Sequence, residues 1–348
     1  MRGAAEAVTK THNPDLLDST QEPPTKRAMT TMSQILRSDQ DLAEKILKLK
    51  KERKALILAH NYQRPEVQDV ADYVDDSVGL ARRSVEEPDA EVIVHCSVDF
   101  MAETAVILNP TKTVLMPSLG ARCPMAAMLP ASQIDQWKRR YPKAPVVLYV
   151  NTLAEAKAKC DICCTSANAA KVVESLDSDT VIFGPDANLA WYVQQRTGKK
   201  LIPIPERGFC QTHVLFLKED ILLLKDENPQ AEVMAHPECT PEVQSVADFI
   251  GSTSQMSTHA RNSNAEKFII ATELGILHRL ERENPNKTFV PAYEGAWCVN
   301  MKLNTLQRIY LALKEDRYRA EVPRDVARKA KAPLERMFEM ANTSLNAK

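Results

Sequence analysis

The chain has 348 residues, of which 44% are hydrophobic and 26% are charged, and its formal net charge at pH 7 is −1. This composition is ordinary for a soluble globular protein, and the near-zero net charge gives no reason to expect nucleic acid or an anionic membrane as a partner. No apolar run approaches the roughly 18 residues of a membrane span, so we expect no membrane association. The 9 glycines form neither GxGxxG nor GxxxxGK[ST], which disfavours a standard dinucleotide or P-loop site.

Residues 1–37 mix acids, prolines and polar residues, and they lack the continuous apolar segment of a signal peptide. We expect this segment to be a disordered tail. A transit peptide is a weaker interpretation, because Glu6, Asp15, Asp18 and Glu22 carry the wrong charge. Without an export signal we expect a cytoplasmic protein, in which the 8 cysteines are metal ligands, nucleophiles or core residues rather than disulfides.

The next segment, "SDQDLAEKILKLKKERK", has apolar residues at helical spacing, with Ser38 as a candidate N-cap, and predicts a helix. Short β-branched runs such as "ALILAHNY", "PVVLYVNT" and "KFIIATELGI" then alternate with segments of helical pattern. A strand followed by a helix, repeated along the chain, predicts an α/β protein with parallel sheets.

Three of these runs end in the same way. "KTVLMPSLGARC" ends at Cys123, "KKLIPIPERGFC" at Cys210 and "KTFVPAYEGAWC" at Cys298, so the intervals are 87 and 88 residues. A near-constant period is the signature of a repeated unit. We therefore predict α/β domains over 38–127, 128–214 and 215–300, and C-terminal helices over 301–348 that close the fold.

Strand ends of such domains are where ligands bind, so these three cysteines are candidate ligands of one metal centre. Three thiolates leave one metal position open, as in catalytic rather than structural sites. The alternative is three buried cysteines of the core, where this residue type is common.

Polar side chains also follow several of the predicted strands, among them those of "LAHNYQ", "LYVNT", "CTSAN", "AHPEC" and "GSTSQ". Each has a plain alternative, because Ser, Thr and Asn before a helix are most often caps. A buried rim with several His, two Tyr and a Glu is costly unless it binds something polar. The rim therefore favours an anionic substrate with many oxygens and a reaction that involves proton transfers.

The segments "HNYQRPEVQDVADYVDDSVGLARR", "LYVNTLAEAKAKCDICCTSANA", "GFCQTH", "HPECTPEVQSVADFIGSTSQM" and "CVNMK" resemble the quinolinate synthase family over roughly residues 40–310. The resemblance implies three similar three-layer α/β/α domains with small parallel sheets around a pseudo-threefold axis. It implies condensation of iminoaspartate with dihydroxyacetone phosphate to quinolinate, phosphate and water, in de novo NAD biosynthesis. It also implies a [4Fe–4S] cluster on Cys123, Cys210 and Cys298, whose open iron acts as a Lewis acid.

The same resemblance assigns residues to the reaction. Tyr62 and Glu238 should transfer protons, with His60 and His236 beside them in the catalytic set. The implied substrate contacts are His60, Ser77, Tyr149, Val150, Asn151, Ser166, His213, His236, Pro237, Glu238, Ser252 and Thr253. L-aspartate oxidase, which supplies iminoaspartate, is the implied functional partner.

The densest cysteine motif, "CDICC", is expected to form part of a strand rather than a metal or redox site. Cys163 and Cys164 fall inside a predicted strand, whereas a C-x-x-C ligand pair normally lies in a turn. Family members with a C-x-x-C-x-x-C run at the third ligand have cysteines where this chain has Ala292 and Gly295. Two other functions stay open: a zinc or redox-binding protein built on "CDICC", and a cluster-containing hydro-lyase of another small acid.

Overall fold

The structure is a computed structural model that describes residues 26–342. The chain divides into two units, Met1–Asp41 and Leu42–Lys348. Helix α1 (Lys26–Glu52) begins at Lys26, before Ser38, where the sequence pattern placed its N-cap. The predicted tail is thereby shortened at its end, and Pro23 and Pro24 are the last helix breakers before α1. The rest of that tail, residues 1–25, lies outside the described residues.

The second unit contains a first parallel sheet in the order β2-β1-β3-β4. Its strands are β1 (Ala55–His60), β2 (Tyr73–Asp75), β3 (Val92–Cys96) and β4 (Thr113–Leu115). The helices between them are α2 (Pro65–Val70), α3 (Ser77–Glu86) and α4 (Asp99–Leu108), and the short α5 (Pro124–Ala127) follows the sheet.

The second sheet has the order β6-β5-β7-β8 and is also parallel. Its elements are α6 (Ala131–Arg140), β5 (Val146–Tyr149), α7 (Ala154–Lys157), β6 (Ile162–Cys164), α8 (Ala169–Glu174), β7 (Thr180–Gly184), α9 (Ala187–Thr197) and β8 (Lys200–Pro203). A single-turn helix η1 (His213–Leu215) follows it.

The third sheet repeats this order as β10-β9-β11-β12, again with parallel pairs only. Its elements are α10 (Lys218–Glu227), β9 (Glu232–Ala235), α11 (Pro241–Gln244), β10 (Phe249–Ile250), α12 (Thr253–Asn262), β11 (Lys267–Ala271), α13 (Ile276–Glu283) and β12 (Thr288–Pro291). A single-turn helix η2 (Met301–Leu303) follows it.

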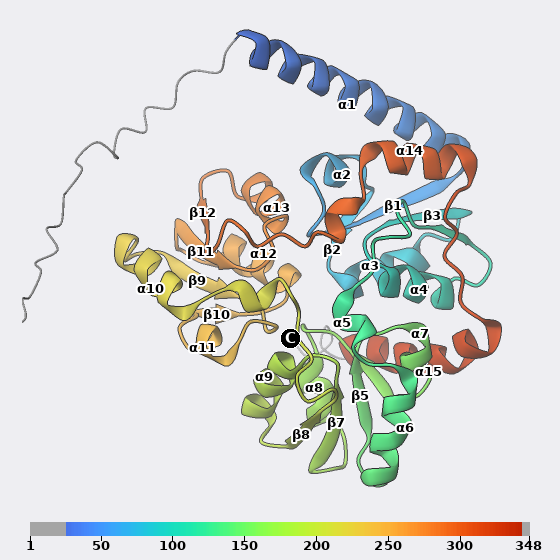
Figure 1. Cartoon of the computed structure of the whole chain (residues 1–348), viewed down its shortest axis with the longest axis vertical. Helices are drawn as coiled ribbons and strands as arrows, with labels where there is room; N and C mark the ends of the chain where they lie inside the picture. Colours follow the sequence, from blue (N-terminus) through green and yellow to red (C-terminus); the bar gives the residue numbers. More distant parts are fainter. Residues whose placement is uncertain (1–25, 343–348) are drawn as a thin grey trace, which may run out of the picture. The chain divides into compact units, whose positions relative to one another are not determined.

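Both faces of each sheet are covered, because alternate strand residues point to opposite faces. In the first sheet Leu56 and Leu58 pack with α3 and α4, whereas Ile57 and Ala59 pack with α1, α2 and α14 (Leu306–Glu315). The third sheet has the same arrangement, with α10 and α11 on one face and α12 and α13 on the other (Figure 1). The predicted fold class of three similar α/β/α units with small parallel sheets is confirmed.

The repetition extends to individual side chains. Asp72, Asp161 and Asp248 each precede the second strand of their sheet. Their carboxylates accept hydrogen bonds from the backbone N–H groups of Ile57, Val146 and Val233 at 2.8, 2.7 and 2.8 Å. One carboxylate in each unit therefore fixes the same turn to the same first strand.

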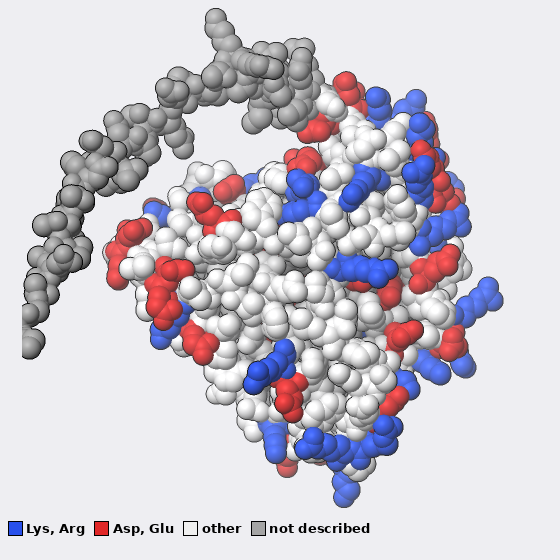
Figure 2. All heavy atoms as spheres, viewed as in Figure 1, with Lys and Arg blue, Asp and Glu red and all other residues white. Residues whose placement is uncertain are grey.

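The C-terminal helices pack on two of these sheets. Helix α14 buries Leu306, Ile309 and Leu313 against the first sheet, and α15 (Arg324–Asn342) buries Leu334 and Met337 beside α7 and β6. The described residues contain no helix that is long and apolar enough to span a membrane. On the face shown in Figure 2, acidic and basic side chains are interspersed along the edge.

Candidate active site at the carboxyl ends of the three sheets

A cavity of about 100 Å³ lies where the carboxyl ends of strands from all three sheets meet. Its volume is several times the roughly 10–15 Å³ that one water molecule needs, so it can accept a ligand. Parallel α/β sheets bind their ligands at this edge. Each first strand delivers two polar side chains to the cavity from its carboxyl end or just beyond it: His60 and Tyr62 at β1, Tyr149 and Asn151 at β5, and His236 and Glu238 at β9.

The three cysteines singled out by their spacing line the same cavity. Cys123 follows β4, Cys210 follows β8 and Cys298 follows β12. All three are half-buried and carry no disulfide. Burial raises the pKa of each thiol, and neighbouring carboxylates raise it further. For Cys123 and Cys210 the other cysteines add to this effect. A bound cation would offset both effects, because metal ions bind the thiolate form.

A carboxylate that follows the third strand of each sheet lies beside the cysteine loop of that sheet. Asp99 accepts a hydrogen bond from the backbone N–H of Cys123 at 2.9 Å, and Glu273 accepts one from Cys298 at 3.0 Å. Asp186 is the equivalent carboxylate of the second sheet and lies near the backbone N–H of Cys210. The sequence analysis missed these three carboxylates, although they recur at the period of the cysteines, 87 residues apart.

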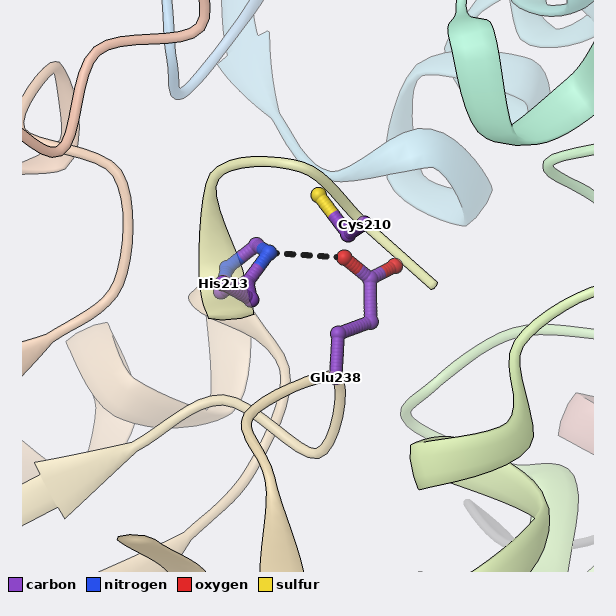
Figure 3. Close-up of side chains that lie close together, drawn as sticks. All are labelled: Cys210, His213 and Glu238. Carbon is purple, nitrogen blue, oxygen red and sulfur yellow. Dashed lines mark ion pairs between the residues drawn. The ribbon is translucent and has the colours of Figure 1, made fainter. Parts of the chain in front are cut away.

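A chain of polar side chains connects Tyr62 to Glu238. The Tyr62 hydroxyl lies 2.7 Å from Oγ1 of Thr272, which lies 2.8 Å from Nε2 of His213. On the other side of its ring, Nδ1 of His213 lies 2.8 Å from Oε2 of Glu238 (Figure 3). Thr272, directly after β11, was not among the predicted residues; its place at a strand end was the signal that could have found it.

Burial and neighbouring charges set the protonation of this chain. Burial acts to raise the pKa of Glu238, but His213 and His236 outweigh it and lower that pKa to about 2. Burial lowers the pKa of His60 and of His236 to about 3. Burial and the charge of Glu238 raise the pKa of Tyr62. At neutral pH the site therefore holds a carboxylate, two neutral imidazoles and a phenol.

Two sets of residues in the cavity could bind a metal. The first is the three cysteines. The second is Cys210, His213 and Glu238, whose ligand atoms all lie within 4.8 Å of one another. Figure 3 shows these three side chains directed toward one another. Cys210 belongs to both sets. Substitution of a residue that belongs to one set alone, such as Cys123, is therefore needed to tell the two possible metal sites apart.

The other side of the cavity is suited to anions. Ser77 is the first residue of α3, Thr253 is the first residue of α12, and Ser166 lies just before α8; all three line the cavity. Helices α3 and α12 have 10 residues each. Asp76 caps α3 and Ser252 caps α12, and the helix dipole favours phosphate or carboxylate groups at such N-termini.

Three predicted contact residues do not line this cavity: Val150, Pro237 and Ser252. Val150 lines a separate small cavity. The Pro237 carbonyl accepts a hydrogen bond from Gln244. Ser252 caps α12 and lines a neighbouring surface groove.

The "CDICC" cysteines belong to the second sheet. Cys163 and Cys164 are fully buried in β6, as the strand prediction required, and pair in register with Leu148 and Tyr149. The Sγ atoms of Cys160 and Cys163 lie 3.7 Å apart. None of the three lines the cavity.

The triplicated fold and the cavity define an α/β enzyme with a thiol-lined, anion-accepting site. Residues 44–339 match the family described as quinolinate synthetase A protein, and the chain belongs to this family. A quinolinate synthase of Pyrococcus horikoshii is 54% identical over 301 residues, which cover 86% of this chain and 99% of the relative. Quinolinate synthases of Methanothermobacter thermautotrophicus and Dehalococcoides mccartyi are 51% and 52% identical over 300 and 299 residues. Each alignment covers 86% of this chain and 98% of the relative.

Proposed function

We propose that this enzyme condenses iminoaspartate with dihydroxyacetone phosphate to form quinolinate, phosphate and water. The observation that carries the proposal is the convergence of three cysteines, one from each repeated unit, on one cavity with an anion-accepting side. Family membership supports the same reaction. The L-aspartate oxidase partner rests on the family resemblance alone, and the cytoplasmic location stays a prediction from the sequence.

The residues present fit a [4Fe–4S] cluster. Cys123, Cys210 and Cys298 supply three sulfur ligands, and no fourth cysteine lines the described cavity. Such a cluster, when bound, supplies an iron with an open position that acts as a Lewis acid. The carboxylates of Asp99 and Glu273 fix the backbones of two of the ligand loops.

The substrates bring carboxylate and phosphate groups, which need donors. Ser77, Ser166 and Thr253 offer hydroxyl groups, and the N-termini of α3 and α12 offer positive partial charge. Asn151 and Tyr149 extend the polar wall toward Glu238. In this proposal the wall holds the anionic ends of the substrates.

The proton transfers use the chain from Tyr62 to Glu238. With Glu238 ionised, Nδ1 of His213 carries the proton that faces it, and Nε2 is free to accept. Thr272 then donates to Nε2 and accepts from Tyr62, so the chain has one direction. Tyr62 takes a proton from the substrate as its own proton passes through Thr272 to Nε2 of His213, and the reverse transfers return a proton to the substrate.

The test is quinolinate formation by anaerobically purified protein supplied with iminoaspartate and dihydroxyacetone phosphate. Wild type should form quinolinate, and Tyr62→Phe should lose about a hundredfold or more in kcat, as expected for loss of an acid–base group. A protein that holds iron and sulfide but forms no quinolinate would instead support the hydro-lyase alternative.

One observation favours a second candidate, a mononuclear metal enzyme. The close grouping of Cys210, His213 and Glu238 has the mixed S, N and O ligands of a catalytic zinc site. In that case Cys123 and Cys298 would not be required for metal binding. The metal content of Cys123→Ser separates this candidate from the first.

A further inference from the structure

Asn61 is fully buried between two residues of the active site, His60 and Tyr62, yet it does not line the cavity. Its side-chain amide makes two hydrogen bonds to other elements. Arg279 Nη1 donates to Oδ1 of Asn61 at 2.9 Å, and Nδ2 of Asn61 donates to Oγ1 of Thr253 at 2.8 Å. We infer that Asn61 and Arg279 are positioning residues that direct the hydroxyl proton of Thr253 into the cavity.

The orientation of the amide follows from hydrogen-bond chemistry. A guanidinium group only donates, so the amide atom that faces Arg279 has to be the oxygen. The nitrogen therefore faces Thr253 and donates to it. Arg279 is itself held by Glu283 at 2.6 Å and by the Val74 carbonyl at 2.9 Å, which keeps the guanidinium in place.

The consequence falls on Thr253, which is the first residue of α12 and lines the cavity. A hydroxyl group has one proton and two lone pairs. Asn61 occupies a lone pair, and Thr253 Oγ1 has no second partner among the described residues. The proton is thus free for a ligand in the cavity, at the N-terminus of a 10-residue helix.

The neighbouring hydroxyl shows the opposite arrangement. Ser252 donates to Oδ2 of Asp76 at 3.1 Å and accepts from the backbone N–H of Gln255 at 3.3 Å. Its proton is already used inside the protein. Of these two adjacent hydroxyl groups, only Thr253 can donate to a ligand, and the ligand atom it suits is an anionic oxygen of a carboxylate or phosphate.

This inference rests on the proposed function for the identity of its ligands, but it can be tested by binding alone. The decisive variant is Asn61→Asp, which keeps the shape and the acceptor for Arg279. It replaces the donor that faces Thr253 with a second acceptor. The Thr253 hydroxyl then has to donate to the carboxylate, and it presents lone pairs to the cavity.

The experiment measures dissociation constants by calorimetry for two probes, quinolinate and dihydroxyacetone phosphate, with the full chain purified anaerobically. We expect Asn61→Asp and Thr253→Val each to weaken the same probe by about tenfold or more, as for loss of a hydrogen bond to a charged group. The probe that weakens identifies the bound oxygen as carboxylate or phosphate. In turnover, the loss should appear in KM rather than in kcat.

A double variant separates orientation from simple charge repulsion. If Asn61 acts through the Thr253 hydroxyl, Asn61→Asp with Thr253→Val binds no more weakly than Thr253→Val alone. If the new charge acts directly, the two losses multiply, and the inference is overturned. Unchanged binding in Asn61→Asp overturns it as well.

Asn109→Asp is the matched control. Asn109 is a buried amide that donates to the Ser84 hydroxyl at 2.9 Å, outside the cavity. The Asn109→Asp protein should unfold more easily than wild type, like the Asn61→Asp protein, but it should bind both probes as wild type does. If the variants show these binding losses but wild type forms no quinolinate, the proposed function fails while the role of Asn61 stands.

Discussion

Replacing Thr272 by Val tests the proton-transfer chain with little change in shape. The substitution removes Oγ1, which lies 2.7 Å from the Tyr62 hydroxyl and 2.8 Å from Nε2 of His213. Tyr62 and His213 remain 3.4 Å apart, a weak direct contact, so proton transfer is impaired but not abolished. Acid–base catalysis contributes about 10²–10⁴-fold, and we expect a loss near the lower end, about a hundredfold in kcat.

The free energy of unfolding should fall as well. Two buried groups lose a partner, at about 1–3 kcal/mol of unfolding free energy each, but their direct contact offsets part of this cost. The assay is steady-state quinolinate formation, with KM for both substrates and iron content measured on the same samples. Thr272→Ser, which restores the hydroxyl, is the control and should recover most of kcat. Wild-type kcat in Thr272→Val, at unchanged iron content, would refute the chain as the route of the proton.

Three further predictions concern the surroundings of the site. Asp99→Ala should lower iron content and speed iron loss to a chelator, because the Cys123 loop loses its 2.9 Å backbone anchor, whereas Asp99→Asn should retain most iron; equal retention in both variants would contradict an anchoring role. Lys302→Met leaves the Glu273 carboxylate, 2.8 Å from the Lys302 ammonium, buried without its partner and should lower the unfolding free energy by about 3–5 kcal/mol in urea titration. Glu273→Gln in the same chain should recover part of that loss, and no recovery would argue against an unpaired charge as the cause. Burial lowers the pKa of His95 to about 4 from 6.5, so the unfolded chain binds the extra proton first and stability falls as the pH drops from about 6.5 toward 4. The cost at pH 5 is about 2 kcal/mol, and His95→Gln should reduce the difference in unfolding free energy between pH 7.5 and pH 5 by that amount; an unchanged difference would refute the neutral, buried state of His95.

The repeated architecture could be predicted because its signals are periodic. Alternation of β-branched runs with helical segments gave parallel sheets, and the intervals between Cys123, Cys210 and Cys298 gave the number of units. The start of α1 was less predictable. A serine that caps a helix and a serine within a helix look alike in sequence, and Ser38 lies within α1.

Some residues of the candidate site could be predicted from the sequence and others could not. Residues that directly follow a first strand, such as Tyr62 and Glu238, could be predicted to reach one edge of their sheets. Thr272 could not be told apart from an ordinary strand-end threonine, because its importance depends on contacts with two other units. The direction of a hydroxyl, which separates Ser252 from Thr253, depends on partners far away in sequence, Asp76 and Asn61.

The central claim is that one metal centre is built from three cysteines of three different units. Its most direct test is iron and sulfide per chain in anaerobically purified wild type, Cys123→Ser and Cys163→Ser. The account predicts about four irons and four sulfides in wild type and in Cys163→Ser, and their loss in Cys123→Ser. A single metal ion without sulfide, retained in Cys123→Ser, would place the centre at Cys210, His213 and Glu238, and a protein emptied by Cys163→Ser would place it in the second sheet; either result would contradict the account.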